Sequence, residues 1–281
     1  MSGIEALLPI RKMTLFRSLG AVLAVLLFIY PAGLGQSDNP ASGSDEKSEA
    51  IIRRSIESLG GPSYLNVRTV IGRGFYTAYQ EELPQLPTRF LDYISYPDQE
   101  RTEFIGSGIR IIQANSGATG WIYDGATRRI SDMKPAQIQD FKTSMRTSIE
   151  NLLRGWWRKE GGTLKYVGRR EAGLAMRNET VRLTYPDGFW IEFEFGARDG
   201  KPAKVIYKRK TQREDTDEFE EILEEDRLAK HITIEGVTAP WVIDHFRNGF
   251  QTSRINYESV EYNRTLAPSL FEKPINPKEL K

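Results

Sequence analysis

The alternation of hydrophobic and polar positions divides the chain into a helical start, a long series of strand-like segments and one interior helix. Residues 48–59 carry apolar side chains at positions 50, 51, 52, 56 and 59 with charged residues between them. That spacing predicts a short amphipathic helix. Gly60, Gly61 and Pro62 follow directly, and they predict its end because glycine suits a C-cap and proline cannot continue a helix.

From residue 67 the hydrophobic period changes to two, which is typical of half-buried strands. We expect about ten strands between residues 67 and 262, joined by tight turns such as Asp124-Gly125 and Asn248-Gly249. Because these turns are local hairpins, the sheet should be antiparallel. In residues 189–195, glutamates at 192 and 194 alternate with apolar residues. This alternation predicts one solvent-facing side and one buried side.

Residues 135–157 form the one clear interior helix of the pattern. Apolar residues recur at three- and four-residue spacing and predict one broad apolar face. These residues are Ile138, Phe141, Met145, Ile149, Leu152, Leu153, Trp156 and Trp157.

The first 35 residues have the three parts of a secretory signal: basic residues, a short apolar run over 19–30 and small residues before position 36. We expect cleavage after Gly35, with Met13 as an alternative start, since the pattern is more compact from there. An uncleaved anchor is the alternative, but an apolar core of about twelve residues is short of the roughly twenty that span a bilayer. Residues 36–46 then predict a flexible linker, and residues 47–281 a single β-rich domain.

Composition narrows the chemistry that is possible. The 281-residue chain has no cysteine, which excludes disulfides, thiolate metal sites and attachment of lipid at a cysteine. Its formal net charge of +1 gives no basic excess, so we expect no nucleic-acid partner.

Candidates for catalysis are few. The two histidines, His231 and His245, lie in strand-like segments, and no G-x-S-x-G nucleophile motif accompanies them. Two distant histidines make a poor zinc site, and the acidic segment 214–226 lacks the spacing of a calcium loop. We interpret that segment as a charged, solvated hairpin or short helix. We therefore expect no enzyme activity, no metal and no cofactor.

Aromatic residues give the main hint of a site. One interpretation is that these residues simply pack the interior helix against the sheet. The other is that they form the wall of an apolar groove that holds an acyl chain. A groove of that kind needs few polar anchors. The candidate contacts are Trp121, Tyr123, Phe141, Met145, Trp156 and Trp157.

The order of short motifs resembles a known family. An early helix ends in Leu59-Gly60-Gly61, residues 119–125 read TGWIYDG before the interior helix, residues 234–241 read IEGVTAPW, and residues 268–274 read PSLFEKP. Over most of residues 47–274 the chain is similar to bacterial periplasmic proteins of the outer-membrane lipoprotein-carrier (LolA/LolB-like) superfamily.

The resemblance implies a curved antiparallel sheet that forms an incomplete β-barrel, with helices on its concave side and an apolar cavity for acyl chains. It implies a monomeric periplasmic carrier of a lipid or lipoprotein acyl chain, with a possible protein partner in the envelope. The alternatives are a non-catalytic structural or interaction module of the cell envelope, and a hydrolase that uses His231 or His245.

Overall fold

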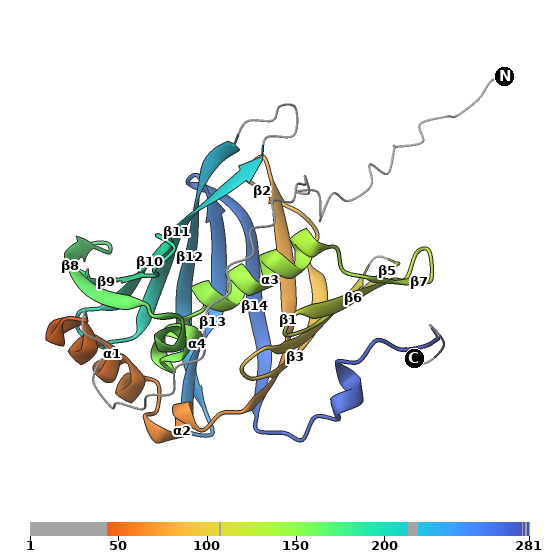
Figure 1. Cartoon of the computed structure of the whole chain (residues 1–281), viewed down its shortest axis with the longest axis horizontal. Helices are drawn as coiled ribbons and strands as arrows, with labels where there is room; N and C mark the ends of the chain where they lie inside the picture. Colours follow the sequence, from red (N-terminus) through yellow and green to blue (C-terminus); the bar gives the residue numbers. More distant parts are fainter. Residues whose placement is uncertain (1–43, 107, 213–218, 277, 279, 281) are drawn as a thin grey trace, which may run out of the picture.

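The computed structural model describes residues 44–280 except 107, 213–218, 277 and 279 (Figure 1). The predicted signal segment 1–35 and residues 36–43 of the predicted linker lie outside the described residues. The last linker positions are described: Leu164 N donates to Ser44 Oγ, Tyr166 N donates to Asp45 Oδ2, and helix α1 begins at Glu46. Ser44 and Asp45, within the predicted linker, therefore contact strand β8.

The helices are short and few. They are α1 (Glu46–Ser58), α2 (Pro62–Leu65), α3 (Pro135–Thr147), α4 (Ile149–Leu153), η1 (Trp156–Glu160) and η2 (Pro268–Leu270). The strands are β1 (Thr69–Gln80), β2 (Leu83–Pro84), β3 (Thr88–Ser95), β4 (Gln99–Gly106), β5 (Ile109–Ser116), β6 (Thr119–Asp124), β7 (Arg129–Asp132), β8 (Thr163–Glu171), β9 (Arg177–Thr184), β10 (Trp190–Gly196), β11 (Pro202–Gln212), β12 (Phe219–Ile234), β13 (Val237–Arg247) and β14 (Phe250–Tyr262).

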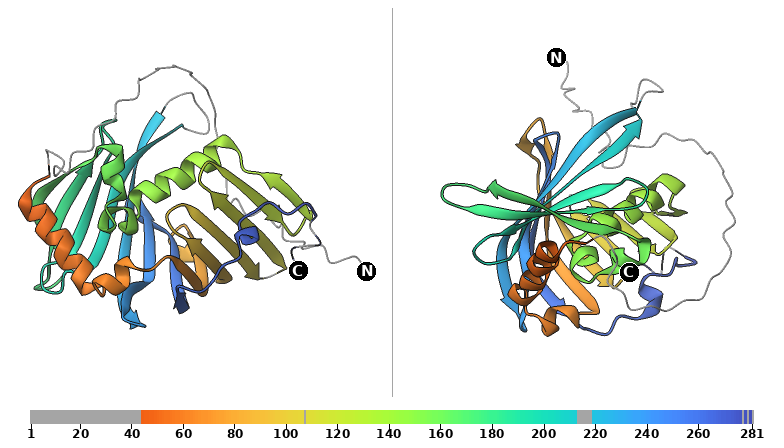
Figure 2. Two further views of the ribbon diagram at one scale, coloured as in Figure 1. Left: turned by 60° about the horizontal axis from the view of Figure 1, so that its bottom comes forward. Right: turned by 60° about the vertical axis from the view of Figure 1, so that its left-hand side comes forward.

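The described strands form one antiparallel sheet in the order β7-β6-β5-β4-β3-β1-β14-β13-β12-β11-β10-β9-β8, with β2 paired to β1. Two meanders meet where β1 pairs with β14, with Val70 opposite Tyr262. The sheet is curved and does not close, because β7 and β8 remain at its two edges (Figure 2). The predicted mainly-β fold, an incomplete antiparallel barrel with helices on its concave side, is confirmed.

This topology explains why helices cross the concave side. The chain must pass from the edge strand β7 to the opposite edge strand β8, and α3, α4 and η1 make that connection across the hollow of the sheet (Figure 2). The predicted single helix over 135–157 is wrong at Ser148, where the backbone is extended (φ −65°, ψ 147°). Ser148 ends α3 and caps α4, because its Oγ accepts a hydrogen bond from Asn151 N at 3.1 Å.

The main core lies at the β8–β10 end of the sheet, beneath α1 and α4. Trp157 is 1% exposed, and Leu164, Leu183 and Phe193 are fully buried. A smaller core cluster on β5 and β6 contains Ile112, Ala114, Trp121, Tyr123 and Leu280. The two clusters leave the middle of the sheet less densely filled.

Gly60 allows α1 to lie against the turn between β12 and β13. A Cβ atom at position 60, where φ is +117°, would lie 2.1 Å from the carbonyl oxygen of Gly236. The contact also lets Leu59 O accept a hydrogen bond from Thr238 N at 2.8 Å. The predicted helix end at Gly60 and Gly61 is therefore a packing requirement as well as a cap.

One prediction about charged residues is wrong, and another, the charged hairpin over 214–226, is confirmed where the structure describes it, because β12 pairs antiparallel with β11. Glu192 and Glu194 on β10 do not face solvent: each is 3% exposed, and Arg170 contacts both, at 2.5 and 3.2 Å. Within the acidic segment, residues 219–226 are part of strand β12, while 214–218 lie outside the described residues. The glutamates of β12 are tolerated in a strand because the neighbouring strand β11 is basic. Arg209 contacts Glu224 at 2.7 Å, and Lys208 contacts Glu221 at 3.2 Å.

Candidate functional site

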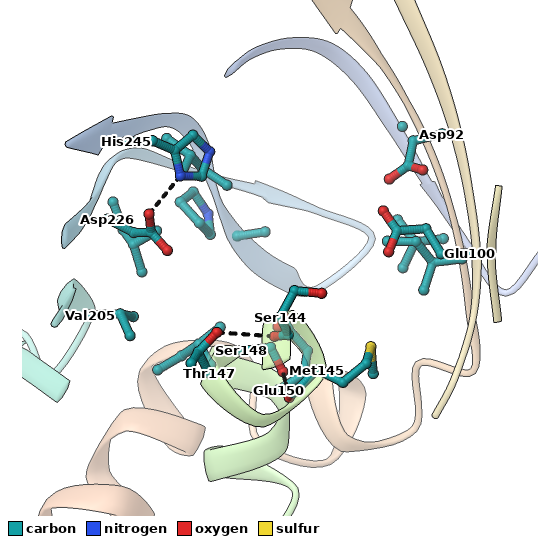
Figure 3. A pocket seen from close by; sticks show the side chains of 18 of the residues that line it. Asp92, Glu100, Ser144, Met145, Thr147, Ser148, Glu150, Val205, Asp226 and His245 are labelled. Carbon is teal, nitrogen blue, oxygen red and sulfur yellow. Dashed lines mark hydrogen bonds and ion pairs between the residues drawn. The ribbon is translucent and has the colours of Figure 1, made fainter. Parts of the chain in front are cut away.

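A cavity of about 810 Å³ lies between α3–α4 and the concave middle of the sheet (Figure 3). Its walls come from α3, α4 and the segment around α2, and from strands β1, β3, β4 and β11–β14. The volume falls within the range of about 300–1,000 Å³ that is usual for small-molecule sites. The crossing helices thus roof a space that neither core cluster fills.

Much of the cavity wall is aliphatic. The apolar residues that line it are Val67, Val70, Ile94, Met145, Ile149, Val205, Leu228, Val237, Ile243 and Val260. These side chains come from helices and from strands on both sides of the β1–β14 junction. The wall can bury a flexible hydrocarbon by contact area alone, without specific hydrogen bonds.

One end of the cavity carries paired charges. His245 Nδ1 is 2.5 Å from Asp226 Oδ1, and Figure 3 shows the two side chains facing each other on β13 and β12. Beside them, Glu224 contacts both Arg209, at 2.7 Å, and Arg247, at 3.2 Å. Each carboxylate at this end therefore has a basic partner.

These neighbouring charges shift the pKa of the His245 imidazole. Burial lowers its pKa, but the hydrogen bond to Asp226 and the charges of Asp226, Glu224 and Asp244 outweigh burial, so the pKa lies above its ordinary value. His231 is different: burial and the charge of Lys201 lower its pKa. His231 does not line the cavity.

Among the described residues, no serine hydroxyl forms a hydrogen bond with the imidazole of His245, although Ser253 lies opposite it on β14. Ser144 Oγ donates to Phe141 O at 2.7 Å, and Ser148 Oγ donates to Met145 O at 2.9 Å. Across the described residues, no group of three or more histidine, aspartate or glutamate side chains is placed to hold a metal ion.

The other end of the cavity carries three carboxyl groups. Asp92 on β3 and Glu100 on β4 point toward each other, and Glu150 projects from α4 (Figure 3). Thr102 Oγ1 lies between the first two, 2.8 Å from Asp92 Oδ1 and 3.5 Å from Glu100 Oε1. Burial raises the pKa of all three groups, and that of Asp92 is raised further by the charge of Glu100.

Tyrosine side chains line the same end. Burial raises the pKa of Tyr64, Tyr96 and Tyr257 well above the ordinary value, and that of Tyr262 to about 12. The charge of Glu150 adds to the rise in all four. These phenols therefore stay neutral and can accept or donate hydrogen bonds.

Of the six contacts expected from the sequence, Met145 lines the cavity. Trp157 lies in the main core, where its Nε1 donates to Leu152 O at 3.0 Å, and Trp156 lies 5.7 Å from the ring of Tyr96. Phe141 is buried on α3, outside the set of residues that line the cavity.

Trp121 and Tyr123 belong to the smaller core cluster. Trp121 Nε1 donates to Phe271 O at 3.0 Å, and Arg101 donates to Leu270 O at 3.0 Å, so the C-terminal tail covers this cluster. The structure thus brings Met145 and Trp156 to the region of the cavity and places Trp121 and Tyr123 elsewhere. Any role of the six in ligand binding stays a prediction.

Sequence reasoning singled out His245 as a catalytic candidate, but it did not place His245, Asp92 or Glu100 in a cavity. Asp92, Glu100 and His245 each lie in a strand, where a charged or polar residue normally indicates a solvent-facing position. The exposed fraction of Asp92 is only 7%. The one available signal was that Asp92 falls between Leu91 and Tyr93 in an otherwise apolar run.

Comparison with known proteins adds information about the fold. The sequence matches no protein-family model and no curated protein sequence. Similar solved structures include a DUF1329 family protein from Desulfovibrio piger, with 10% identity and a TM-score of 0.52 over 80% of this chain and 97% of that chain. A putative outer membrane lipoprotein-sorting protein domain from Vibrio parahaemolyticus has 10% identity and a TM-score of 0.50, over 80% and 96% of the two chains.

A LolA superfamily protein from Nitrosomonas europaea is similar at the same level, with 12% identity and a TM-score of 0.51 over 80% of this chain and 97% of that chain. At such low identity the likeness concerns the fold. The resemblance drawn from the sequence is confirmed at that level: the chain has a LolA-like fold, as a divergent example of it.

Proposed function

We propose that this protein is a periplasmic binding or carrier protein that holds an acyl chain of a lipid or lipoprotein in the cavity beneath α3 and α4. The cavity of about 810 Å³ with its aliphatic wall is the observation that supports the proposal most. Burying an acyl chain yields about 0.8 kcal/mol per methylene, so a long chain can offset the cost of association without further contacts. The lipoprotein-sorting name of one similar structure is consistent with this proposal.

The location and the absence of catalysis belong to the same proposal. Residues 1–35 have the pattern of a signal peptide, and removal of that segment would release the domain into the periplasm. None of the helices in the described ranges is long and apolar enough to cross a membrane. Among the described residues the imidazole of His245 has a hydrogen bond to Asp226 and none to a hydroxyl group, so the structure supplies no paired nucleophile for hydrolysis.

Native mass spectrometry of the protein purified from its own organism tests the proposal. We expect a bound mass that is released on denaturation and is identified as a lipid or acylated species. The variant Ala239→Trp places a large ring in the cavity wall, and it should lose that mass. Ala229→Trp is the matched control, because Ala229 is exposed on the neighbouring strand β12 and should keep the ligand.

Circular dichroism must first show that both variants are folded. If the wild-type protein carries no lipid and does not bind added acyl probes, the proposed function is wrong.

A second candidate function is a non-catalytic interaction module of the envelope. Large apolar side chains are exposed at the end of the sheet where β2 meets the β13–β14 turn: Leu83 is 66% exposed, Leu86 82% and Phe250 60%. Exposed apolar groups of this kind are common at protein contacts. If this end docks a partner, serine at all three positions should abolish in-cell crosslinking to that partner while leaving acyl-probe binding unchanged.

A further inference from the structure

The two polar ends of the cavity differ in how their carboxyl groups are satisfied. At the His245 end, Asp226 and Glu224 have basic partners within 3.2 Å. At the other end, Asp92, Glu100 and Glu150 take part in no ion pair with any described residue. Asp92 and Glu100 therefore face each other at one end of the cavity (Figure 3), and the charge of Glu150 from α4 acts on Glu100, while no cation pairs with any of the three among the described residues.

The nearest cation, Arg154, is occupied elsewhere. Its guanidinium donates to the backbone carbonyl oxygens of Tyr64 at 3.0 Å, Leu65 at 3.1 Å and Val67 at 2.9 Å. Its charge lowers the pKa of Glu150, but this influence is smaller than that of burial, which raises it. Arg154 thus holds the α2 segment in place and forms no ion pair with the carboxyl groups.

A buried tyrosine hydroxyl gives independent evidence that the polar groups at this end are incompletely satisfied. Tyr64 is 5% exposed and Tyr262 6% exposed, and both line the cavity. Among the described residues, the hydroxyl of Tyr262 has no hydrogen-bond partner. A buried polar atom without a partner costs about 1–3 kcal/mol, so such an arrangement usually serves a purpose.

The groups that face one another here come from every element packed around this end. They are Asp92 on β3, Tyr96 after β3, Glu100 on β4, Tyr257 and Tyr262 on β14, Tyr64 on α2, Glu150 on α4 and Arg154 after α4. Apart from Arg154, all of them present oxygen atoms that can accept a hydrogen bond.

We propose that this end of the cavity binds a primary ammonium group, so that the ligand is an amphiphile whose acyl chain lies along the aliphatic wall and whose cationic amine meets Asp92, Glu100 and Glu150. This inference rests on the proposed function and specifies its ligand. An ammonium group has three N–H donors around a compact charge, and these suit several oxygen acceptors that approach from different sides. A metal ion is a poorer fit, because these carboxyl groups form no metal-binding cluster within the described part of the chain.

Binding of an ammonium group to these carboxyl groups should depend on pH. Burial raises the pKa of the three carboxyl groups, so in the empty cavity they retain protons at a pH where exposed carboxyl groups are ionised. An ammonium ion binds the ionised form and must displace those protons. Affinity for an amine should therefore rise as pH increases through the raised pKa values, whereas affinity for a neutral ligand should stay nearly constant.

Two probes with the same chain test the proposal: dodecylamine and dodecanol, each competing with a fluorescent acyl probe. The full mature protein should bind the amine about tenfold more tightly than the alcohol at pH 8, as expected for one charge-assisted hydrogen bond. The preference should shrink toward pH 5, where the amine is still charged because its pKa is near 10.

The isosteric variants Glu150→Gln and Asp92→Asn should each reduce the preference for the amine while leaving dodecanol binding within about twofold of wild type. Asp140→Asn is the matched control, because Asp140 lines the cavity but lies 3.6 Å from Arg209 at the opposite end. It should keep the preference.

The outcomes separate the two proposals. Equal binding of amine and alcohol by the wild-type protein at pH 8 overturns the ammonium site and leaves the acyl-binding function intact. A preference for the amine that persists in both carboxyl variants and at pH 5 also overturns the site. Binding of neither probe overturns both. The pH series on the wild-type protein needs no variant, so it decides the question even if a substitution prevents folding.

Discussion

Replacing Asp92 by asparagine should stabilise the folded protein, although the same change weakens binding of an amine. Asp92 is 7% exposed and accepts a hydrogen bond from Thr102 at 2.8 Å. Burial and the charge of Glu100 raise its pKa well above the ordinary value, so the folded state binds a proton that the unfolded state releases near pH 4. The asparagine carbonyl can keep the hydrogen bond from Thr102 without this proton uptake.

The expected gain in the free energy of unfolding follows from the linkage between folding and proton binding. A folded-state pKa above the unfolded value gives stability that is complete below the unfolded pKa and is lost as pH rises through the folded pKa. Each unit of difference corresponds to about 1.4 kcal/mol. We expect Asp92→Asn to raise the free energy of unfolding at pH 7 by about 1–3 kcal/mol, the usual cost of an incompletely satisfied buried polar group.

Urea denaturation at pH 4, 5.5, 7 and 8 measures the effect. The advantage of the variant should be near zero at pH 4 and grow with pH. Asp187→Asn is a control of opposite sign: hydrogen bonds from Phe189 N and Arg146 lower the pKa of Asp187, so that variant should be slightly less stable at pH 7. If Asp92→Asn is less stable than wild type at pH 7, or if the difference in free energy of unfolding does not change with pH, Asp92 is not a buried acid with a raised pKa.

Three further predictions concern the core, the sheet and the cavity. Trp157→Ala should lower the free energy of unfolding by about 3–5 kcal/mol in urea denaturation, because Trp157 is 1% exposed in the main core; a loss below about 1 kcal/mol would contradict this packing. Gly74→Val should lower the melting temperature measured by circular dichroism, because a Cβ atom there would lie 2.0 Å from Asn256 O; an unchanged melting temperature would mean that β1 and β14 approach less closely. In a series of linear alcohols, each added methylene should tighten binding about fourfold, from about 0.8 kcal/mol, until the chain fills the cavity; affinity independent of chain length in calorimetry would argue against an apolar cavity.

The architecture was largely predictable because hairpin turns and period-two alternation are local signals. The turn predicted at Asn248-Gly249 and the end of the strand region at residue 262 match the two ends of β14, Phe250–Tyr262. The break at Ser148 was missed, because the apolar spacing continues through it and the capping role of its hydroxyl depends on a change of chain direction. The sequence left a hairpin or a short helix open for the acidic segment 214–226, because glutamates disfavour strands unless a basic neighbour pairs with them, and β11 supplies that neighbour only in the fold.

The candidate site was much less predictable. Alternation tells which residues share a face of a strand, but not whether that face is the concave one. Asp92 and Asp226 thus have the pattern of solvent-facing acids, and only the curvature of the sheet and the crossing helices turn them inward. Trp121 has the pattern of a pocket residue, yet the C-terminal tail, 150 positions away, covers it.

Photocrosslinking tests most directly whether the cavity beneath α3 and α4 is the acyl-binding site. A fatty amine with a diazirine near the end of its chain is bound, irradiated and located by peptide mass spectrometry. The account predicts adducts on cavity-lining residues such as Met145, Ile243 and Val260, and their loss in Ala239→Trp. Adducts confined to exposed apolar residues such as Leu86 or Phe250, unchanged in that variant, would contradict it.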